Sequence, residues 1–108
     1  KTAGSAEQVY DRAFARQVLR RAFEHLEAEF ADGRRVGPFA AIREYFAPDY
    51  AGTHAELAPR YAMTESQMAS FIHRARGRFR ELVRHQVRDL VADPSHIEAE
   101  LRNLLAAL

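Results

Sequence analysis

One stretch of the sequence, residues 64–90, constrains the fold most strongly, because a single helical period orders nearly all of its apolar side chains. At steps of about 100° per residue, these side chains fall within an arc of roughly 160°. The arc contains Met68, Phe71, Ile72, Ala75, Phe79, Leu82, Val83, Val87 and Leu90, and the remaining arc is filled by Arg74, Arg76, Arg78, Arg80, Arg84 and Arg88. Thr64 and Gln67 have the spacing of a capping box. The pattern predicts an amphipathic helix that follows Thr64 and is the longest in the chain.

Start and stop signals predict two helices in the first half of the chain. Ser5 with Gln8 three residues later fits a capping box, and apolar residues then recur at helical spacing until Gly33. Pro38 suits the first position of a short second helix, which Pro48 ends. We therefore expect a long first helix, a turn, and a short second helix.

Two further helices are predicted on either side of the long arginine-rich one. Thr53 with Glu56 fits another capping box, and the helix that it opens contains Pro59 later than the first turn. Asp93 and Pro94 supply an N-cap and a first-turn proline for a last helix over residues 93–108. No stretch alternates with the period of a strand. The fold class expected is all-α, a small bundle of about five helices.

Length and composition favour one domain over residues 1–108. The chain has 108 residues, of which 47% are hydrophobic, which is enough for one core. It contains no cysteine, which excludes disulfides and thiolate zinc sites and favours a cytoplasmic protein. No apolar run has the length of a membrane span. Position 1 is lysine rather than methionine, so we expect a longer parent chain.

The residues that enzymes and metal sites require are not found in their usual spacings. The five histidines show no His-Glu-x-x-His pattern, and there is no glycine-rich phosphate loop or nucleophile elbow. Ser66 or Ser70 near His73 could imitate a catalytic pair, but no third orienting group accompanies them. We expect no enzyme activity, no metal and no cofactor.

The charged face of the long helix has one sign, since Glu81 is the only acid between Phe71 and Arg88. A solvated helix surface usually mixes both signs, although a plain surface remains an alternative. Two capped helices joined by a turn of about three residues are what a helix-turn-helix needs. The side chains that point outward at the start of the second helix are Ser66, Gln67, Ser70, His73 and Arg74. Such groups can address base edges, and the arginines beyond them can reach phosphates.

The stretch THAELAPRYAMTESQMASFIHRARGRFREL resembles region 4, the C-terminal promoter-binding domain of bacterial sigma-70 family factors, most closely the extracytoplasmic-function (ECF) group. The matching residues are Thr53, Glu56, Leu57, Ala58, Tyr61, Met63, Thr64, Met68, Ile72, His73, Arg74, Ala75 and Arg76. The stretches DRAFARQVLRRAFEHLEAEF and VADPSHIEAELRNLLAAL are also similar to an ECF-like subgroup with an added C-terminal helix.

The resemblance implies a winged-helix-like fold without a wing, in which residues 1–48 dock on the β flap of RNA polymerase. Residues 53–91 would form a helix-turn-helix that binds the −35 promoter element, and residues 93–108 an extension. The family's contact positions fall on Glu65, Ser66, Gln67, Ala69, Ser70 and Arg74. With the outward residues, the DNA-binding set predicted is Thr64, Glu65, Ser66, Gln67, Ser70, His73, Arg74, Arg76 and Arg78.

The sequence departs from the family at two positions. Ala62 stands where a turn glycine is usual, at a cost of roughly 1 kcal/mol if the turn keeps a positive φ. Ala69 stands where the family often has lysine or arginine. Gly77 points outward, where it would let a phosphate approach or is simply tolerated.

Protein partners are the last expectation from the sequence. The aromatic stripe of the second helix suits either the core of the bundle or, if exposed, a groove for a partner such as the polymerase flap. Its residues are Phe39, Ile42, Tyr45 and Phe46. The alternative function is a helical interaction module that binds RNA polymerase, an anti-sigma factor or another acidic partner, with little DNA specificity. The acidic residues of segment 93–108 also allow an autoinhibitory fold-back onto the arginines.

Overall fold

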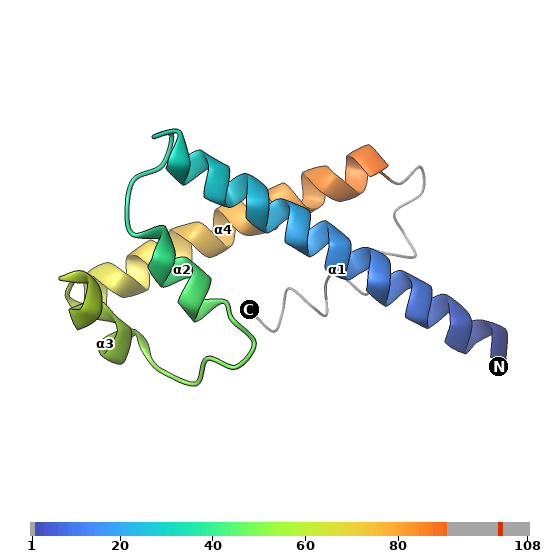
Figure 1. Ribbon diagram of the computed structural model, residues 1–108, viewed down its shortest axis with the longest axis horizontal. Helices are drawn as coiled ribbons and strands as arrows, with labels where there is room; N and C mark the ends of the chain where they lie inside the picture. The colour runs from blue at the N-terminus through green and yellow to red at the C-terminus, as the bar shows by residue number, and fades with distance from the viewer. Residues whose placement is uncertain (1, 91–101, 103–108) are drawn as a thin grey trace. The chain divides into compact units, whose positions relative to one another are not determined.

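The computed structural model describes residues 2–90 and 102, and within this part of the chain it is helical with no strand (Figure 1). The elements are α1 (Thr2–Ala31), α2 (Phe39–Tyr45), α3 (His54–Leu57), the 3₁₀ helix η1 (Ala58–Tyr61) and α4 (Glu65–Leu90). The prediction of an all-α class is confirmed for these residues. The last helix expected, over 93–108, lies outside the described residues except for Arg102.

Several predicted helix bounds are corrected by the structure. α1 begins at Thr2, so Ser5 lies inside the helix and the capping box predicted there is wrong. No proline stands before Ser5 to stop the helix earlier. With 30 residues, α1 and not the 26-residue α4 is the longest helix described. Gly33 has a φ of +83° just beyond the end of α1, as its predicted role as helix terminator requires.

The short helix α2 also differs from the prediction at both ends. Pro38 is its N-cap, with an extended ψ of 94°, and not its first helical residue. The helix ends at Tyr45, before Pro48, with Phe46 as the C-cap. The early end has a steric reason, because the residue that precedes a proline, here Ala47, is disfavoured in helical conformation.

The described residues belong to two compact units, of which the first combines the described parts of Lys1–Leu26 and Phe79–Leu108. Both stretches supply apolar side chains that are at most 8% exposed: Ala15, Val18, Ala22 and Leu26 from α1, and Phe79, Leu82, Val83 and Val87 from α4. The rings of Phe23 and Phe79 meet edge to face with centroids 6.2 Å apart. Within the described part of this unit, α1 and α4 therefore bury the apolar stripes that the sequence predicts.

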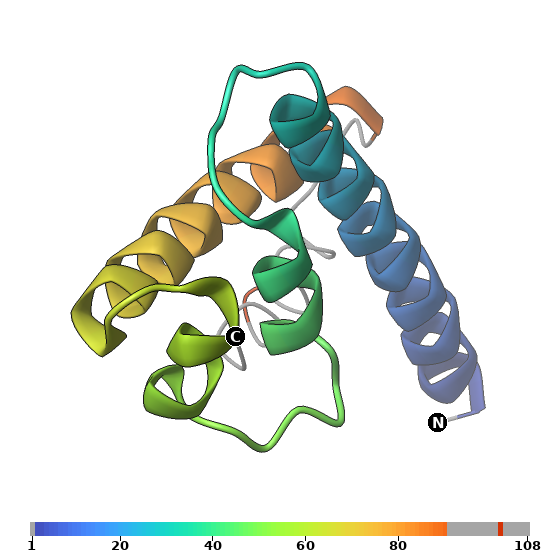
Figure 2. The same cartoon turned by 60° about the vertical axis from the view of Figure 1, so that its left-hand side comes forward.

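The second unit, Glu27–Arg78, contains the end of α1, all of α2, α3 and η1, and the first half of α4. Figures 1 and 2 both show α2 and α3 beside the first turns of α4. Its buried apolar residues are Ala41, Ile42, Leu57, Ala58, Met68, Phe71, Ile72 and Ala75. Phe30 packs against both Phe39 and Phe71, with ring centroids 5.4 and 6.0 Å away.

Gly37 allows the loop between α1 and α2 to pass close to this core. Its φ is +138°, and a Cβ atom built on it would overlap the ring of Phe71. Any side chain at this position would therefore be strained and would displace a core ring.

No helix within the described residues combines the length and the apolar character that crossing a bilayer requires.

Candidate functional site

The site predicted from the sequence lies in the second unit and begins with the cap of α3. The side chain of Glu56 accepts a hydrogen bond from the Thr53 backbone N–H at 2.8 Å, and Thr53 Oγ1 accepts one from the Glu56 N–H at 3.2 Å. Both halves of the predicted capping box are therefore present. The α-helix stops at Leu57, and Pro59 stands at the start of η1, where its missing N–H is tolerated.

The turn between η1 and α4 is closed by Ala62 in a left-handed conformation, with φ 56° and ψ 41°. The N–H of Ala62 donates to the carbonyl of Pro59, and the N–H of Met63 donates to the carbonyl of Ala58. This pair of bonds is the Schellman pattern of a helix end, in which glycine is the usual residue. The turn thus keeps the positive φ despite the missing glycine, at a cost of about 1 kcal/mol for the alanine.

A second reciprocal capping box begins α4, as the sequence predicts. Gln67 Oε1 accepts from the Thr64 N–H at 2.8 Å, and Thr64 Oγ1 accepts from the Gln67 N–H at 3.1 Å. Both side chains fix the direction in which α4 leaves the turn. The side-chain oxygen of Gln67 is used in this cap, so the side-chain NH₂ group remains as the donor for other contacts.

Most of the predicted DNA-binding residues lie together on one exposed face of α4. We define the reading face as the exposed side chains of Ser66, Gln67, Ser70, His73 and Arg74. Thr64 and Glu65 are exposed beside it, at the N-terminal end of the helix. Behind the helix, Met68 and Ile72 are fully buried in the second unit, so packing holds the reading face outward. Ala69 is partly covered.

Arg78 differs from the other predicted DNA-binding residues, because it is held by a buried acid. Its Nε donates to both carboxylate oxygens of Glu29 at 3.1 and 3.2 Å, and its Nη2 donates to Oε2 at 2.7 Å. Arg35 Nε donates to the same carboxylate at 2.9 Å. Hydrogen bonding to Arg78, aided by Arg35 and opposed by burial, lowers the pKa of Glu29 to about 2. Arg78 therefore serves packing, and we leave it out of the reading face.

Arg76 is not on the open charged half of α4 where the sequence analysis placed it. At 100° steps it falls between Val83 and Val87, inside the apolar arc, and in the structure its Nε is buried. Its guanidinium carbon lies 6.0 Å from the ring centroid of Tyr45 in α2. The same ring is stacked on His54, with centroids 5.0 Å apart and planes 24° apart. Arg76 thus bridges α4 to the aromatic residues of α2 and α3.

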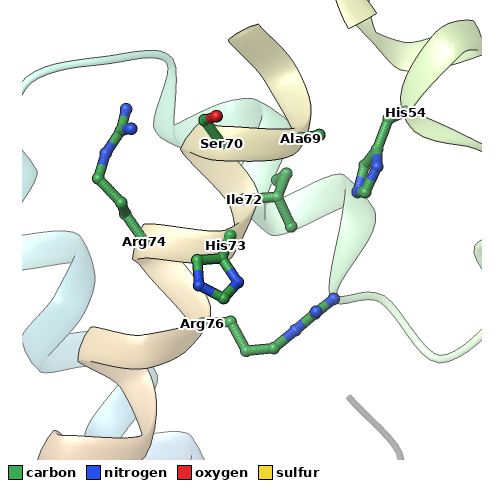
Figure 3. Close-up of a pocket in the computed structure, with 7 residues that line it drawn as sticks. All are labelled: His54, Ala69, Ser70, Ile72, His73, Arg74 and Arg76. Atoms are coloured by element: carbon green, nitrogen blue, oxygen red, sulfur yellow. The ribbon is translucent and has the colours of Figure 1, made fainter. Parts of the chain in front are cut away.

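His54 and Arg76 border a hollow of about 440 Å³ between α3 and α4. Its lining consists of His54, Ala69, Ser70, Ile72, His73, Arg74 and Arg76, with no carboxylate among them. Figure 3 shows Ser70 and Arg74 on one side of α4, with His54 and Arg76 reaching toward one another on the other. The hollow therefore adjoins the reading face.

The predicted partner residues of α2 divide into core and surface. Ile42 is fully buried, which confirms the core interpretation for that residue. Phe39, Tyr45 and Phe46 are partly exposed. The guanidinium of Arg43 lies over the Phe39 ring, 5.2 Å from its centroid, and Arg43 also pairs with Glu27.

Sequence reasoning missed Glu29 and His54. A signal existed for Glu29, which lies three residues after Leu26 and therefore on the apolar stripe of α1, where a carboxylate needs a buried partner. No comparable signal identified His54, because its neighbour Tyr45 comes from another helix.

Among the described residues, no group of three or more His, Asp or Glu side chains could hold a metal ion. Comparison of the chain with protein-family models, with curated proteins and with solved structures gave no match.

Proposed function

We propose that this chain binds DNA as a module resembling region 4 of an ECF-like sigma factor. In this proposal α3, η1 and α4 form a helix-turn-helix, and the reading face of α4 contacts the −35 element of a promoter. The bound module brings RNA polymerase to that promoter. No catalytic step is assigned to the chain.

The observation that carries the proposal is the reading face itself. It places hydrogen-bonding side chains on the first turns of a capped helix, where a helix-turn-helix protein contacts base edges. The tight turn at Ala62 and the packing of Met68 behind the helix supply the rigidity that base reading needs. Arg74 adds a cation that forms no ion pair with a described residue. A DNA phosphate could form an ion pair with this guanidinium.

A second candidate function is supported by the partly exposed rings of α2. Phe39, Tyr45 and Phe46 present apolar surface of the kind that protein partners bury. In this alternative the chain is an interaction module for RNA polymerase or an anti-sigma factor, with little DNA specificity. The two functions are also compatible, since region 4 of a sigma factor contacts both polymerase and promoter.

The test is fluorescence anisotropy of the 108-residue chain with duplexes that carry a randomised site, at one fixed moderate salt concentration. We expect some sequences to bind at least about tenfold more tightly than the pool, which is the scale of base discrimination by one or two contacts. Ser70→Ala should change the ranking of the sequences. Arg74→Gln should weaken all of them by about tenfold.

The matched control is Arg34→Gln, which removes an exposed arginine from the loop after α1, where it pairs with Asp32 at 2.8 Å. This change should leave affinity and ranking nearly unchanged. Equal binding to every sequence, together with binding to a polymerase β-flap fragment that Phe46→Ser abolishes, would replace the proposal by its alternative.

A further inference from the structure

We infer that His54 and Arg76, supported by the ring of Tyr45, form a binding position for a phosphate group at the edge of the reading face. The inference rests on the proposed function for the source of that phosphate, which is the DNA backbone. It adds to the proposal a residue of α3, a residue of α2 and a distinct role for Arg76.

Two buried side-chain nitrogens beside the hollow lack a hydrogen-bond partner in the described part of the chain. The Nε2 atom of His54 and the Nε atom of Arg76 are buried, and neither has a hydrogen-bond partner among the residues that the structure describes. Buried polar nitrogens are nearly always paired, so two such atoms on the border of one hollow call for an explanation. Because an arginine N–H only donates, the partner that suits Arg76 must offer an acceptor oxygen.

The hollow is lined by several basic side chains. Its lining includes Arg74, Arg76, His54 and His73, together with the hydroxyl of Ser70, and it contains no carboxylate. An anion with several oxygens matches these groups, since it can accept from Arg76 and from a histidine at once. The hollow, at about 440 Å³, is large enough for a phosphate group.

Few contacts oppose a movement of His54 and Arg76 toward an anion. Tyr45 stacks on His54 and lies below the Arg76 guanidinium, so one ring supports both side chains. Since the buried nitrogens have no hydrogen bond to a described residue, turning them toward an anion breaks none. Neither side chain forms an ion pair with a described residue, in contrast to Arg78.

The phosphate that suits this position is one of the DNA backbone. The hollow shares Ser70, His73 and Arg74 with the reading face. A helix in the major groove is flanked by a phosphate backbone on each side. In Figure 3, Arg74 lies on one side of α4 and the pair His54 and Arg76 on the other. We therefore assign the pair to one strand and Arg74 to the opposite edge of the groove.

The test compares the salt dependence of DNA binding in the full chain and its variants, with a duplex selected from the randomised pool. Each phosphate contact that is lost should reduce the slope of log K against log salt by about 0.9. Arg76→Gln is expected to lose about one such contact, to bind three- to tenfold more weakly, and to keep the ranking of sequences. Arg76→Lys should restore much of the slope.

His54→Phe keeps a ring stacked on Tyr45 but removes the nitrogens, and we expect binding to weaken about threefold. Arg34→Gln serves as the control, because it removes one charge outside the hollow. This variant should bind like the wild type. Circular dichroism of every variant, with unchanged helix content and midpoint of thermal unfolding, shows that the differences do not come from misfolding.

A neutral methylphosphonate linkage, moved one position at a time along the duplex, locates the contact. At one position the neutral linkage should weaken DNA binding by the wild type and leave binding by Arg76→Gln unaffected. Sequence-dependent binding in which Arg76→Gln keeps the wild-type slope would overturn the inference while the proposed function stands.

A direct probe separates the sources of phosphate. Inorganic phosphate and pyrophosphate are titrated into the isotope-labelled chain while the Nε–H signal of Arg76 and the ring signals of His54 are followed. Shifts of both signals without any DNA binding would retain the phosphate position, move its source to a small molecule, and reject the proposed function. The inference would be overturned if the Arg76 and His54 signals did not shift with phosphate or pyrophosphate, or if they shifted only with an acidic peptide.

Discussion

Arg74 and Arg78 lie four residues apart on α4, in the second unit, but they belong to groups with different surroundings. The Glu29 cluster (Glu29, Arg35 and Arg78) joins the end of α1 to α4 around a carboxylate that is 6% exposed. The reading face presents Arg74 to solvent with no acid paired to it among the described residues. The same side chain on the same helix thus serves packing in one place and remains available for a ligand in the other.

This difference shows that the charge pattern of one helix does not assign a role to each of its arginines. The partner from another element does so, because a buried carboxylate must be neutralised by a cation nearby. Arg78 lies only about 20° from Phe71 at the border of the apolar arc, whereas Arg74 lies about 60° from it. Variants of both groups and of residues beside them test the comparison, beginning with the largest effect expected.

The largest effect is expected when acid protonates Glu29 and thereby removes its ion pairs with Arg78 and Arg35. The pKa of Glu29 is about 2 in the folded chain, against 4.5 for an ordinary glutamate, so its stabilising effect is complete above pH 5. As pH falls from about 5 to 2, the folded chain should lose about 3 kcal/mol of unfolding free energy through this group. Urea denaturation across this range should show the loss in the wild type and a much flatter profile in Glu29→Gln.

Glu27→Gln is the matched control for the acid experiment. Glu27 also pairs with an arginine, Arg43, but both partners are largely exposed, and such pairs contribute little to stability. The pH profile of this variant should follow that of the wild type. A profile of Glu29→Gln that is as steep as the wild-type profile would show that Glu29 is not the group responsible.

At neutral pH the two arginines should separate stability from binding. Arg78→Gln leaves Glu29 with Arg35 alone and should lower the unfolding free energy by about 2 kcal/mol, below the full cost of breaking a buried pair because Arg35 remains. Arg74→Gln should change it by less than about 0.5 kcal/mol. Under conditions in which both variants are folded, Arg74→Gln should lower the DNA affinity more than Arg78→Gln does. Equal losses of stability would contradict the comparison.

The helical elements of the described chain could be predicted well from sequence, because their signals are local. The capping boxes at Thr53 and Thr64 and the terminator Gly33 all have their predicted roles. The start of α1 was wrong, since a spacing such as that of Ser5 and Gln8 also occurs inside a helix. The sequence placed Pro59 within a helix, but it did not predict that the α-helix α3 would give way to the 3₁₀ helix η1 at this point.

The candidate site could be predicted only as far as it lies on one helix. Ser66, Ser70 and Arg74 follow from the period of α4 alone, and all three are exposed as expected. The environments of Arg76 and Arg78 depend on Tyr45 and Glu29, which belong to other helices. Contacts between elements far apart in sequence leave no periodic signal, and for this reason the burial of Arg78 against Glu29 was not predicted. The misplacement of Arg76 has another cause, because the helical period itself puts this residue inside the apolar arc.

Gly77 offers a smaller test of the reading face. It is exposed within α4, and a Cβ atom built there would meet nothing within 4 Å. Gly77→Ala should therefore raise the unfolding free energy by about 0.5–1 kcal/mol, as expected for a helix interior. If a DNA phosphate approaches the backbone here, the same variant should bind DNA more weakly although it is more stable. Unchanged affinity would exclude that approach at Gly77.

The smallest effect is expected at the turn that precedes the reading face. Ala62→Gly relieves the left-handed alanine but gains chain entropy in the unfolded state, so the net stabilisation should be about 0.5 kcal/mol. The control is the same substitution at Ala28, exposed inside α1, which should destabilise by about 1 kcal/mol. Opposite signs in chemical denaturation would establish the positive φ in solution. Two losses of similar size would mean that residue 62 adopts an ordinary conformation, and the direction in which α4 leaves the turn would then need another cause.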